Sequence, residues 1–334
     1  MPPRPPERWY DASPRRSWLE PLGWLYGALV AARRRAYAAG LLRSGRAGCP
    51  VIVIGNLTVG GTGKTPLTLW LAAQLQARGF AVGILSRGYG RTDRAVRVVQ
   101  ADSPWQEVGD EPLLLARRSG CVTVVAADRL AGARHLYALG ARVILCDDGL
   151  QHLALARDCE IVVIDGARGF GNGRLLPAGP LREPATRLGL AQLAVVNGPP
   201  DHPSLQGGAG LLRMELVPGA AQPLKPGTAA RPLGSFRTAA VHAVAAIGNP
   251  ARFFAQLRAQ GLNLIEHPFP DHHPLSASEL DFGDERAVLM TEKDAVKCAG
   301  FTAARFWYVP VEARFSDFDA RELLTRVRTH TGDP

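Results

Sequence analysis

The feature that most constrains this chain is an apolar run that leads directly into a glycine-rich loop. The run Val51-Ile52-Val53-Ile54 is continuous and β-branched, which predicts a strand buried on both faces of a parallel sheet. The loop that follows reads Thr58-Val59-Gly60-Gly61-Thr62-Gly63-Lys64-Thr65, and residues 66–75 have helical spacing. Strand, glycine loop and helix in this order are typical of a phosphate-binding P-loop in an α/β fold.

Each part of this loop suits a nucleotide phosphate. Glycines let backbone N–H groups close around phosphate oxygens, and the helix N-terminus adds partial positive charge. We expect Lys64 to reach the β- and γ-phosphates of ATP and the Thr65 hydroxyl to bind Mg²⁺. The usual motif begins with glycine, where this chain has Thr58. A glycine-rich turn without nucleotide is the alternative, but Gly-Lys-Thr after such a strand favours the P-loop.

Two aspartates follow a second apolar run. Residues 141–146 predict a strand, and Asp147 and Asp148 come directly after it. A P-loop that transfers or hydrolyses phosphate needs a carboxylate at the end of a neighbouring strand to hold the metal. Asp147 is the candidate for that role. Paired aspartates also occur as solvated caps between a strand and a loop, which is the alternative interpretation.

Length and cysteine usage bound the domain count and the compartment. At about 150 residues per domain, 334 residues predict two compact domains. The five cysteines are odd in number and form no C-x-x-C pair, so neither a disulfide framework nor a zinc site is visible. A reducing compartment follows as the expectation.

The formal charge of +9 is concentrated at one end of the chain. Residues 1–46 contain nine arginines and three acidic residues, together with half of all tryptophans and half of all tyrosines. Arginines and aromatic rings around a short apolar run are favoured at a membrane interface. The apolar run, residues 21–32, would reach about 18 Å as a helix, against a hydrocarbon core of about 30 Å. It is therefore expected to lie in the interface rather than to cross it.

Two other interpretations of this N-terminal segment stay open. It could be an ordinary amphipathic helix packed on the protein. It could also be a secretory signal, since Ala36-Tyr37-Ala38 resembles a cleavage site, although three arginines intervene and a nucleotide loop suits the cytoplasm.

Turn-forming residues suggest where the domains divide. Residues 199–238 are rich in Pro, Gly and Ala, and strand and helix signals resume at 239–244 and 251–257. We expect an interfacial region over 1–45, a P-loop nucleotide-binding domain over 46–205, a linker over 206–238 and a smaller α/β domain over 239–334. Both domains are expected to contain parallel sheets.

Several longer motifs follow one another along the chain. They are the P-loop, Ser86-Arg87-Gly88-Tyr89-Gly90, Val108-Gly109-Asp110-Glu111-Pro112, Asp147-Asp148-Gly149-Leu150-Gln151-His152, the block at 171–183, Phe269-Pro270-Asp271-His272-His273 and Thr291-Glu292-Lys293-Asp294-Ala295-Val296-Lys297. In content and order they resemble the motifs of tetraacyldisaccharide 4′-kinases of lipid A biosynthesis, and the resemblance spans nearly the whole chain. The family's P-loop also has threonine where this chain has Thr58.

This resemblance implies an activity, a place and an architecture. The γ-phosphoryl group of ATP would pass to the 4′-hydroxyl of a tetraacylated disaccharide 1-phosphate. The enzyme would act at the cytoplasmic face of the inner membrane, as a peripheral or monotopic protein against anionic lipid. Two α/β domains would be joined by a short two-stranded link, with the active site between them. Neither nucleic acid nor a protein partner is expected.

The resemblance also implies residue roles. Asp110 resembles the family's proton acceptor, with Glu111 as a second carboxylate at the metal beside Thr65 and Asp147. His272, with His273 next to it, is expected to orient Asp110, which requires the domains to close. Alternatively, residues 110–112 could simply open a helix, and His267, His272 and His273 could form a metal cluster.

Further residues are candidates on the acceptor side. The segment 168–187 carries four arginines, four glycines and three prolines, which predicts a structured loop. Arg182 is the first choice to hold a phosphate, and solvated loop arginines are the alternative. Asp148, Gln151 and Arg87 are also assigned to the acceptor, although a turn role suits Gln151 equally. Lys293 and Lys297 are expected on a solvated helix or in interdomain pairing.

Three other functions compete with an acceptor kinase. A membrane-associated partitioning ATPase shares Gly-Gly-Thr-Gly-Lys-Thr but has a lysine before the paired glycines, where this chain has Val59. A nucleic-acid-binding protein would explain the basic charge, but no zinc-finger or RNP pattern accompanies it. A kinase for a soluble metabolite would leave the N-terminal helix unexplained.

Overall fold

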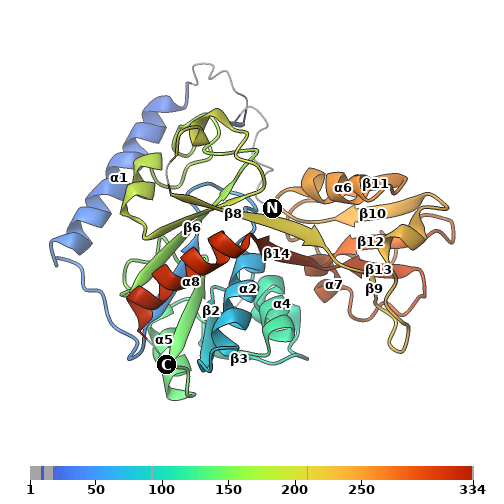
Figure 1. Cartoon of the computed structure of the whole chain (residues 1–334), viewed down its shortest axis with the longest axis horizontal. Helices are drawn as coiled ribbons and strands as arrows, with labels where there is room; N and C mark the ends of the chain where they lie inside the picture. The colour runs from blue at the N-terminus through green and yellow to red at the C-terminus, as the bar shows by residue number, and fades with distance from the viewer. Residues whose placement is uncertain (1–8, 11–17, 92, 209, 333–334) are drawn as a thin grey trace.

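Two sheets organise the chain, as seen in a computed structural model that describes residues 9–10, 18–91, 93–208 and 210–332 (Figure 1). We call the larger sheet with helices α2–α5 and α8 the P-loop lobe, and the smaller sheet with α6 and α7 the C-terminal lobe. The α/β fold predicted from the sequence is confirmed. Of the basic N-terminal stretch, arginines 4, 8, 15 and 16 and the acids Glu7 and Asp11 lie outside the described residues.

The larger sheet has nine strands in the order β14-β8-β7-β6-β1-β5-β2-β4-β3. It is parallel except at its two edges, where β3 and β14 pair antiparallel. β1 lies at the centre and is buried along its whole length, as the β-branched run predicted. The strands are β1 Val51–Gly55, β2 Val82–Ser86, β3 Arg97–Val99, β4 Val122–Val125, β5 Val143–Asp147, β6 Cys159–Asp165, β7 Leu193–Asn197, β8 Leu211–Pro218 and β14 Val311–Phe315.

Helices cover both faces of this sheet. α2 (Lys64–Gln76), α4 (Asp110–Ser119) and α8 (Asp317–Thr331) contribute Leu71, Leu115 and Leu323 to the core on one face. α5 (Arg129–Ala138) contributes Leu136 to the core on the other face. The short helix α3 (Trp105–Val108) precedes α4, and the 3₁₀ turns η2 (Ala185–Leu190) and η3 (Pro203–Leu205) lie on either side of β7. This arrangement brings the carboxyl ends of β1 and β5 to one edge, beside the start of α2.

The C-terminal lobe has five strands in the order β11-β10-β12-β13-β9. Its strands are β9 Gln222–Pro223, β10 Val241–Ala245, β11 Leu264–Pro268, β12 Val288–Thr291 and β13 Phe306–Val309, with η4 at Leu233–Phe236. α6 (Pro250–Ala259) packs Phe253 and Leu257 on one face, and α7 (Glu292–Lys297) packs Ala295 on the other.

A pair of antiparallel strands links the two lobes. β8 runs out from the larger sheet, and β14 pairs with it from Met214 to Pro218 on the way back. α8 then packs Leu323, Leu324 and Val327 into the core of the P-loop lobe. The chain from Val311 onward therefore returns to the larger sheet. All of residues 239–334 were expected in the smaller domain from the sequence alone. Hydrophobic periodicity does not reveal which core a helix joins.

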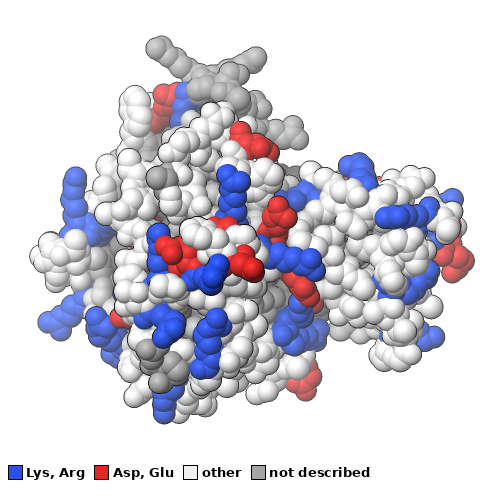
Figure 2. Space-filling view, viewed as in Figure 1, with Lys and Arg blue, Asp and Glu red and all other residues white. Residues whose placement is uncertain are grey.

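One long helix lies along the outside of the P-loop lobe (Figure 1). α1 spans Glu20–Ala38, and only Gly23 within it is buried. Within the described part of the chain, no helix has the length and apolar character that crossing a membrane would require. Figure 2 shows basic side chains scattered over both lobes on one face of the molecule, without a continuous basic stripe.

Candidate active site

The glycine loop between β1 and α2 is folded for a phosphate. Gly60 and Gly63 have φ angles of 100° and 99°, in the left-handed region that glycine adopts without strain. The Asn197 side chain donates to the Thr62 carbonyl at 2.9 Å, which fixes the loop against β7. The Thr62 hydroxyl is buried and has no hydrogen-bond partner among the described residues. A buried polar atom without a partner costs free energy, so this loop fits a ligand with acceptor oxygens.

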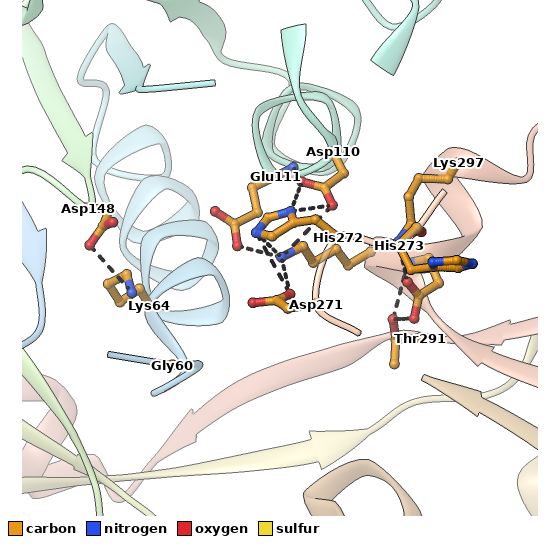
Figure 3. A network of polar contacts seen from close by, with 12 residues as sticks. Gly60, Lys64, Asp110, Glu111, Asp148, Asp271, His272, His273, Thr291 and Lys297 are labelled. Carbon is orange, nitrogen blue, oxygen red and sulfur yellow. Dashed lines mark hydrogen bonds and ion pairs between the residues drawn. The ribbon is translucent and has the colours of Figure 1, made fainter. Parts of the chain in front are cut away.

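Lys64, the first residue of α2, points from this loop toward the acidic end of β5 (Figure 3). Its Nζ lies 3.3 Å from Asn56 Oδ1 and 3.5 Å from Asp148 Oδ1. The ammonium group is therefore held over the loop, where a terminal phosphate would reach it.

Asp147 ends β5 beside the loop and is 1% exposed. The Thr68 hydroxyl donates to it at 3.4 Å. Burial, and then the nearby Glu111 carboxylate, raise the pKa of Asp147 well above its ordinary range. Carboxylate and hydroxyl oxygens are ligands that a hard divalent cation prefers, so Asp147, Glu111 and the Thr65 hydroxyl are the residues that could hold Mg²⁺.

Asp148 joins the phosphate loop to the arginine-rich loop. Its φ of 50° is unusual for a residue other than glycine. Its carboxylate lies 3.3 Å from Arg182 Nη1 as well as 3.5 Å from Lys64. Although burial opposes ionisation, these two cations hold the pKa of Asp148 well below its ordinary range. Arg182 is thus part of the site and not a free surface charge.

Gln151 and Arg87 lie at the same edge of the sheet. The Gln151 amide nitrogen donates to Glu183 Oε1 at 3.0 Å and to the Asn56 carbonyl at 3.3 Å, so it ties the two loops together. Arg87 follows β2 and is exposed. Burial, Arg129 and Arg87 lower the pKa of His152 to about 4. Basic groups therefore surround this edge.

Asp110 and His272 meet between the lobes, in the pairing that the family resemblance implied. His272 Nδ1 lies 2.9 and 3.1 Å from the two oxygens of Asp110. Asp110 is 3% exposed at the start of α4, and His272 adopts a φ of 62° in the loop after β11. Burial would raise the pKa of Asp110, but Lys293 and His272 hold it well below its ordinary range. Burial lowers the pKa of His272, and the hydrogen bond that His272 donates to Asp110 outweighs this and raises it.

The three histidines considered as a metal cluster have separate partners. His267 pairs with His242 at 2.9 Å, His272 with Asp110, and His273 with Glu279 at 2.8 Å. Across the described residues, no group of three or more His, Cys, Asp or Glu side chains is arranged to hold a metal ion. The geometry therefore favours the pairing of His272 with Asp110.

Three site residues carry no local signal in the sequence. Gly248 packs so closely that a Cβ there would lie 2.9 Å from the Gly61 nitrogen. Arg129 is 2% exposed, and its Nε and Nη2 have no partner among the described residues. Lys293 Nζ lies 2.9 Å from Glu111 Oε1, so the expected interdomain pairing applies to it. The docking of the two lobes brings Gly248 and Lys293 to the site, whereas the packing of α5 within the P-loop lobe brings Arg129 there.

A nine-stranded α/β lobe with a P-loop, a buried carboxylate at the end of β5 and a second carboxylate presented between two lobes defines a P-loop phosphotransferase. Comparison with known proteins makes the class specific. The family described as tetraacyldisaccharide-1-P 4′-kinase matches residues 15–329. The chain belongs to the tetraacyldisaccharide 4′-kinase family, and it is an ATP-dependent kinase of lipid A biosynthesis.

Individual relatives agree over nearly the full length. The tetraacyldisaccharide 4′-kinase of Alkalilimnicola ehrlichii is 54% identical, over 89% of this chain and 88% of its own. That of Nitrosococcus oceani is 50% identical, over 94% and 92%. A crystal structure of LpxK from Aquifex aeolicus in complex with ATP superposes with a TM-score of 0.77 at 28% identity, over 94% of this chain and 98% of that one. These matches favour an acceptor kinase over the three alternatives considered above.

Proposed function

We propose that this kinase transfers the γ-phosphoryl group of ATP to the 4′-hydroxyl of a tetraacyldisaccharide 1-phosphate, with Asp110 as the proton acceptor. The observation that carries the proposal is the Asp110–His272 pair, which lies between the lobes beside the phosphate loop. In the reaction, the acceptor oxygen forms a bond to the γ-phosphorus, the bond from that phosphorus to the β,γ-bridging oxygen breaks, and ADP leaves. The hydroxyl proton passes to the Asp110 carboxylate.

His272 acts on this step through Asp110. A carboxylate is a weak base toward a sugar hydroxyl, so its orientation and the hydrogen bond it receives matter. His272 Nδ1 holds the Asp110 carboxylate at 2.9 Å and shares the proton that the carboxylate gains. Phosphoryl transfer otherwise depends on positioning and on neutralising charge, which the remaining residues supply.

We assign the nucleotide to residues Thr58–Thr65, with Lys64 on its terminal phosphates. Mg²⁺ would be held by Thr65, Asp147 and Glu111, and when bound it neutralises charge on the phosphates. This assignment is supported by the buried Thr62 hydroxyl, which has no partner in the described part of the chain, and by the Glu111 carboxylate near the buried Asp147.

The acceptor's phosphate suits the basic edge formed by Arg87, Arg129 and Arg182. Arginine forks match phosphate oxygens, and a buried guanidinium with unpartnered nitrogens is costly unless an anion meets it. Asp148 and Gln151 hold this edge in place through Arg182 and Glu183.

The lipid acceptor explains the exposed face of α1. Trp18 just before the helix and Leu22, Leu25 and Leu29 within it follow one another at spacings of three or four, so they share one side. We assign this side to the cytoplasmic face of the inner membrane, where anionic lipid attracts the neighbouring arginines. The opposite side packs Gly23 and Gly27 against Leu175.

We propose the domain bounds expected from the sequence, with one change at the C-terminal end. The interfacial region is 1–45, the P-loop domain begins at 46 and the linker covers 206–238, with β8 inside it. We place residues 311–331 with the P-loop domain, because β14 and α8 pack there.

Transfer of label from γ-labelled ATP to a detergent-solubilised disaccharide 1-phosphate tests the proposal. Label should appear on the sugar, and Asp110→Asn should abolish its appearance. Label released only as inorganic phosphate, or normal turnover of Asp110→Asn, would contradict the proposal.

A further inference from the structure

Lys293 enters the active site from the C-terminal lobe, from the start of α7. Its side chain is 14% exposed, and its Nζ lies 2.9 Å from Glu111, 3.4 Å from Asp271 and 3.3 Å from His272 Nε2. Asp110 lies 3.9 Å away. An ammonium group has three donors, and three acceptors face it here. Figure 3 shows Glu111, Asp271 and His272 turned toward this shared position.

The contact with His272 selects one form of the imidazole ring. Nδ1 faces the Asp110 carboxylate, which accepts a hydrogen bond. Nε2 faces an ammonium group, which can only donate. In the neutral ring, this network therefore places the proton on Nδ1, aimed at Asp110. Asp110 and Lys293 favour this tautomer from opposite sides of the ring.

The contact with Asp271 matters for the phosphate loop. A Cβ on Gly248 would lie 3.3 Å from Asp271 Oδ2 and 2.9 Å from the Gly61 nitrogen, so this carboxylate borders the loop. Together with Asp110 and Glu111, it would repel an incoming phosphate. The Lys293 ammonium group lies within 3.9 Å of all three carboxylates and neutralises part of this charge.

We propose that Lys293 is a positioning residue of the kinase reaction, holding Asp110 and His272 in their working arrangement across the two lobes and neutralising the carboxylates beside the phosphate loop. The inference rests on the proposed function, because that function makes Asp110 the proton acceptor. It goes beyond an ion pair that merely joins the lobes. Such a pair also exists, since Arg118 and Glu292 join α4 and α7 at 2.7 Å, at the end of α4 remote from Asp110.

Steady-state kinetics of three full-length variants with ATP and detergent-solubilised acceptor test the inference. Lys293→Met should lower kcat by about 100-fold with the acceptor KM changed less than about threefold, because a transition-state arrangement is lost and ground-state binding is not. Lys293→Arg should restore part of kcat, since its N–H groups can donate to the same acceptors. Glu292→Gln, the matched control on α7, should stay within about threefold of the parent protein.

A double-mutant comparison distinguishes a residue that positions His272 from one that only supports the fold. Because Lys293 acts through His272, combining Lys293→Met with His272→Ala should lower kcat by no more than about threefold below His272→Ala alone. If the effects of the two substitutions on kcat multiply, the inference is overturned. A parental kcat in Lys293→Met would also overturn it. If Asp110→Asn also keeps turnover, the proposed function fails with it. If Asp110→Asn is inactive while Lys293→Met is active, only the role of Lys293 fails.

A measurement on the parent protein keeps the inference testable if Lys293→Met does not fold. At alkaline pH, ¹⁵N NMR of histidine-labelled protein should show His272 protonated at Nδ1 and unprotonated at Nε2, with the signal assigned by its loss in His272→Gln. A proton on Nε2 would overturn the inference.

Discussion

His272 Nδ1 lies 2.9 Å from the Asp110 carboxylate, although 162 positions separate the two residues in the chain. Asp110 comes from the P-loop lobe and His272 from the C-terminal lobe, so the contact exists only while the lobes are together. The sequence predicted that this pair would require closure, and here the lobes are in contact.

Asp110→Asn should therefore abolish turnover while leaving ATP binding nearly unchanged. The amide keeps the shape of the side chain but cannot accept the proton, and general-base catalysis contributes about 10²- to 10⁴-fold. Steady-state kcat and the ATP dissociation constant check this together. A parental kcat would remove Asp110 from its assigned role.

Lys64→Met should abolish phosphoryl transfer because it weakens the interaction with ATP, and not the binding of the acceptor. The ammonium group, 13% exposed, is the cation held over the phosphate loop, and Asp148 keeps Arg182 as a partner when it is gone. ATP affinity and kcat should both fall, with the melting temperature within a few degrees of the parent. Unchanged ATP affinity would show that the phosphates bind elsewhere.

The phosphate loop and its metal carboxylate were predictable because their signals are local. Val51–Ile54, the glycines and Asp147 each owe their position to neighbours in the chain. Arg129 was missed because, after Asp128, it reads as an ordinary first residue of a helix, and only packing buries it. Gly248 and Lys293 likewise reach the site through the docking of two lobes. β14 and α8 were expected in the smaller domain, but they pack with the larger sheet. An amphipathic pattern does not indicate which surface a helix or strand will cover.

Arg129→Met should weaken acceptor binding without weakening the fold. The guanidinium is 2% exposed, and two of its nitrogens have no partner among the described residues. Replacing an unpaired buried cation with an apolar side chain of similar size is often neutral or stabilising. We expect the acceptor KM to rise at least about tenfold while the melting temperature stays equal or rises.

Arg134→Met on the same helix is the control, because the Arg134 guanidinium is exposed and donates to the Arg46 carbonyl at 3.3 Å. Unchanged acceptor KM in Arg129→Met would place the acceptor's phosphate elsewhere.

Glu279→Gln should make the stability of the protein less sensitive to acid. Hydrogen bonds from Ser276, and then from His273, lower the pKa of Glu279 to about 2. An unfolded glutamate titrates at about 4.3, so this stabilisation is complete above that pH and is lost as the pH falls toward the folded value. Urea unfolding across this range should show a shallower decline for the variant. Ser276→Ala should act in the same direction, and parallel pH profiles would contradict the assignment.

Replacing Leu25 and Leu29 with serine should reduce binding to anionic vesicles. Both side chains are exposed, at 59% and 63%, on the outward side of α1 (Figure 1). Burying a leucine is worth about 1.5–3 kcal/mol, so each substitution should lower the partition coefficient by about tenfold or more. Leu139→Ser, 45% exposed at the end of α5, is the matched control and should bind as the parent does. The Tyr26 hydroxyl on α1 donates to the Arg182 carbonyl at 3.1 Å, so α1 also contacts the loop at the active site. A loss of vesicle binding should lower activity on bilayer-embedded acceptor more than on detergent-solubilised acceptor. Equal vesicle binding by the double variant and the parent would show that this side of α1 does not meet the membrane.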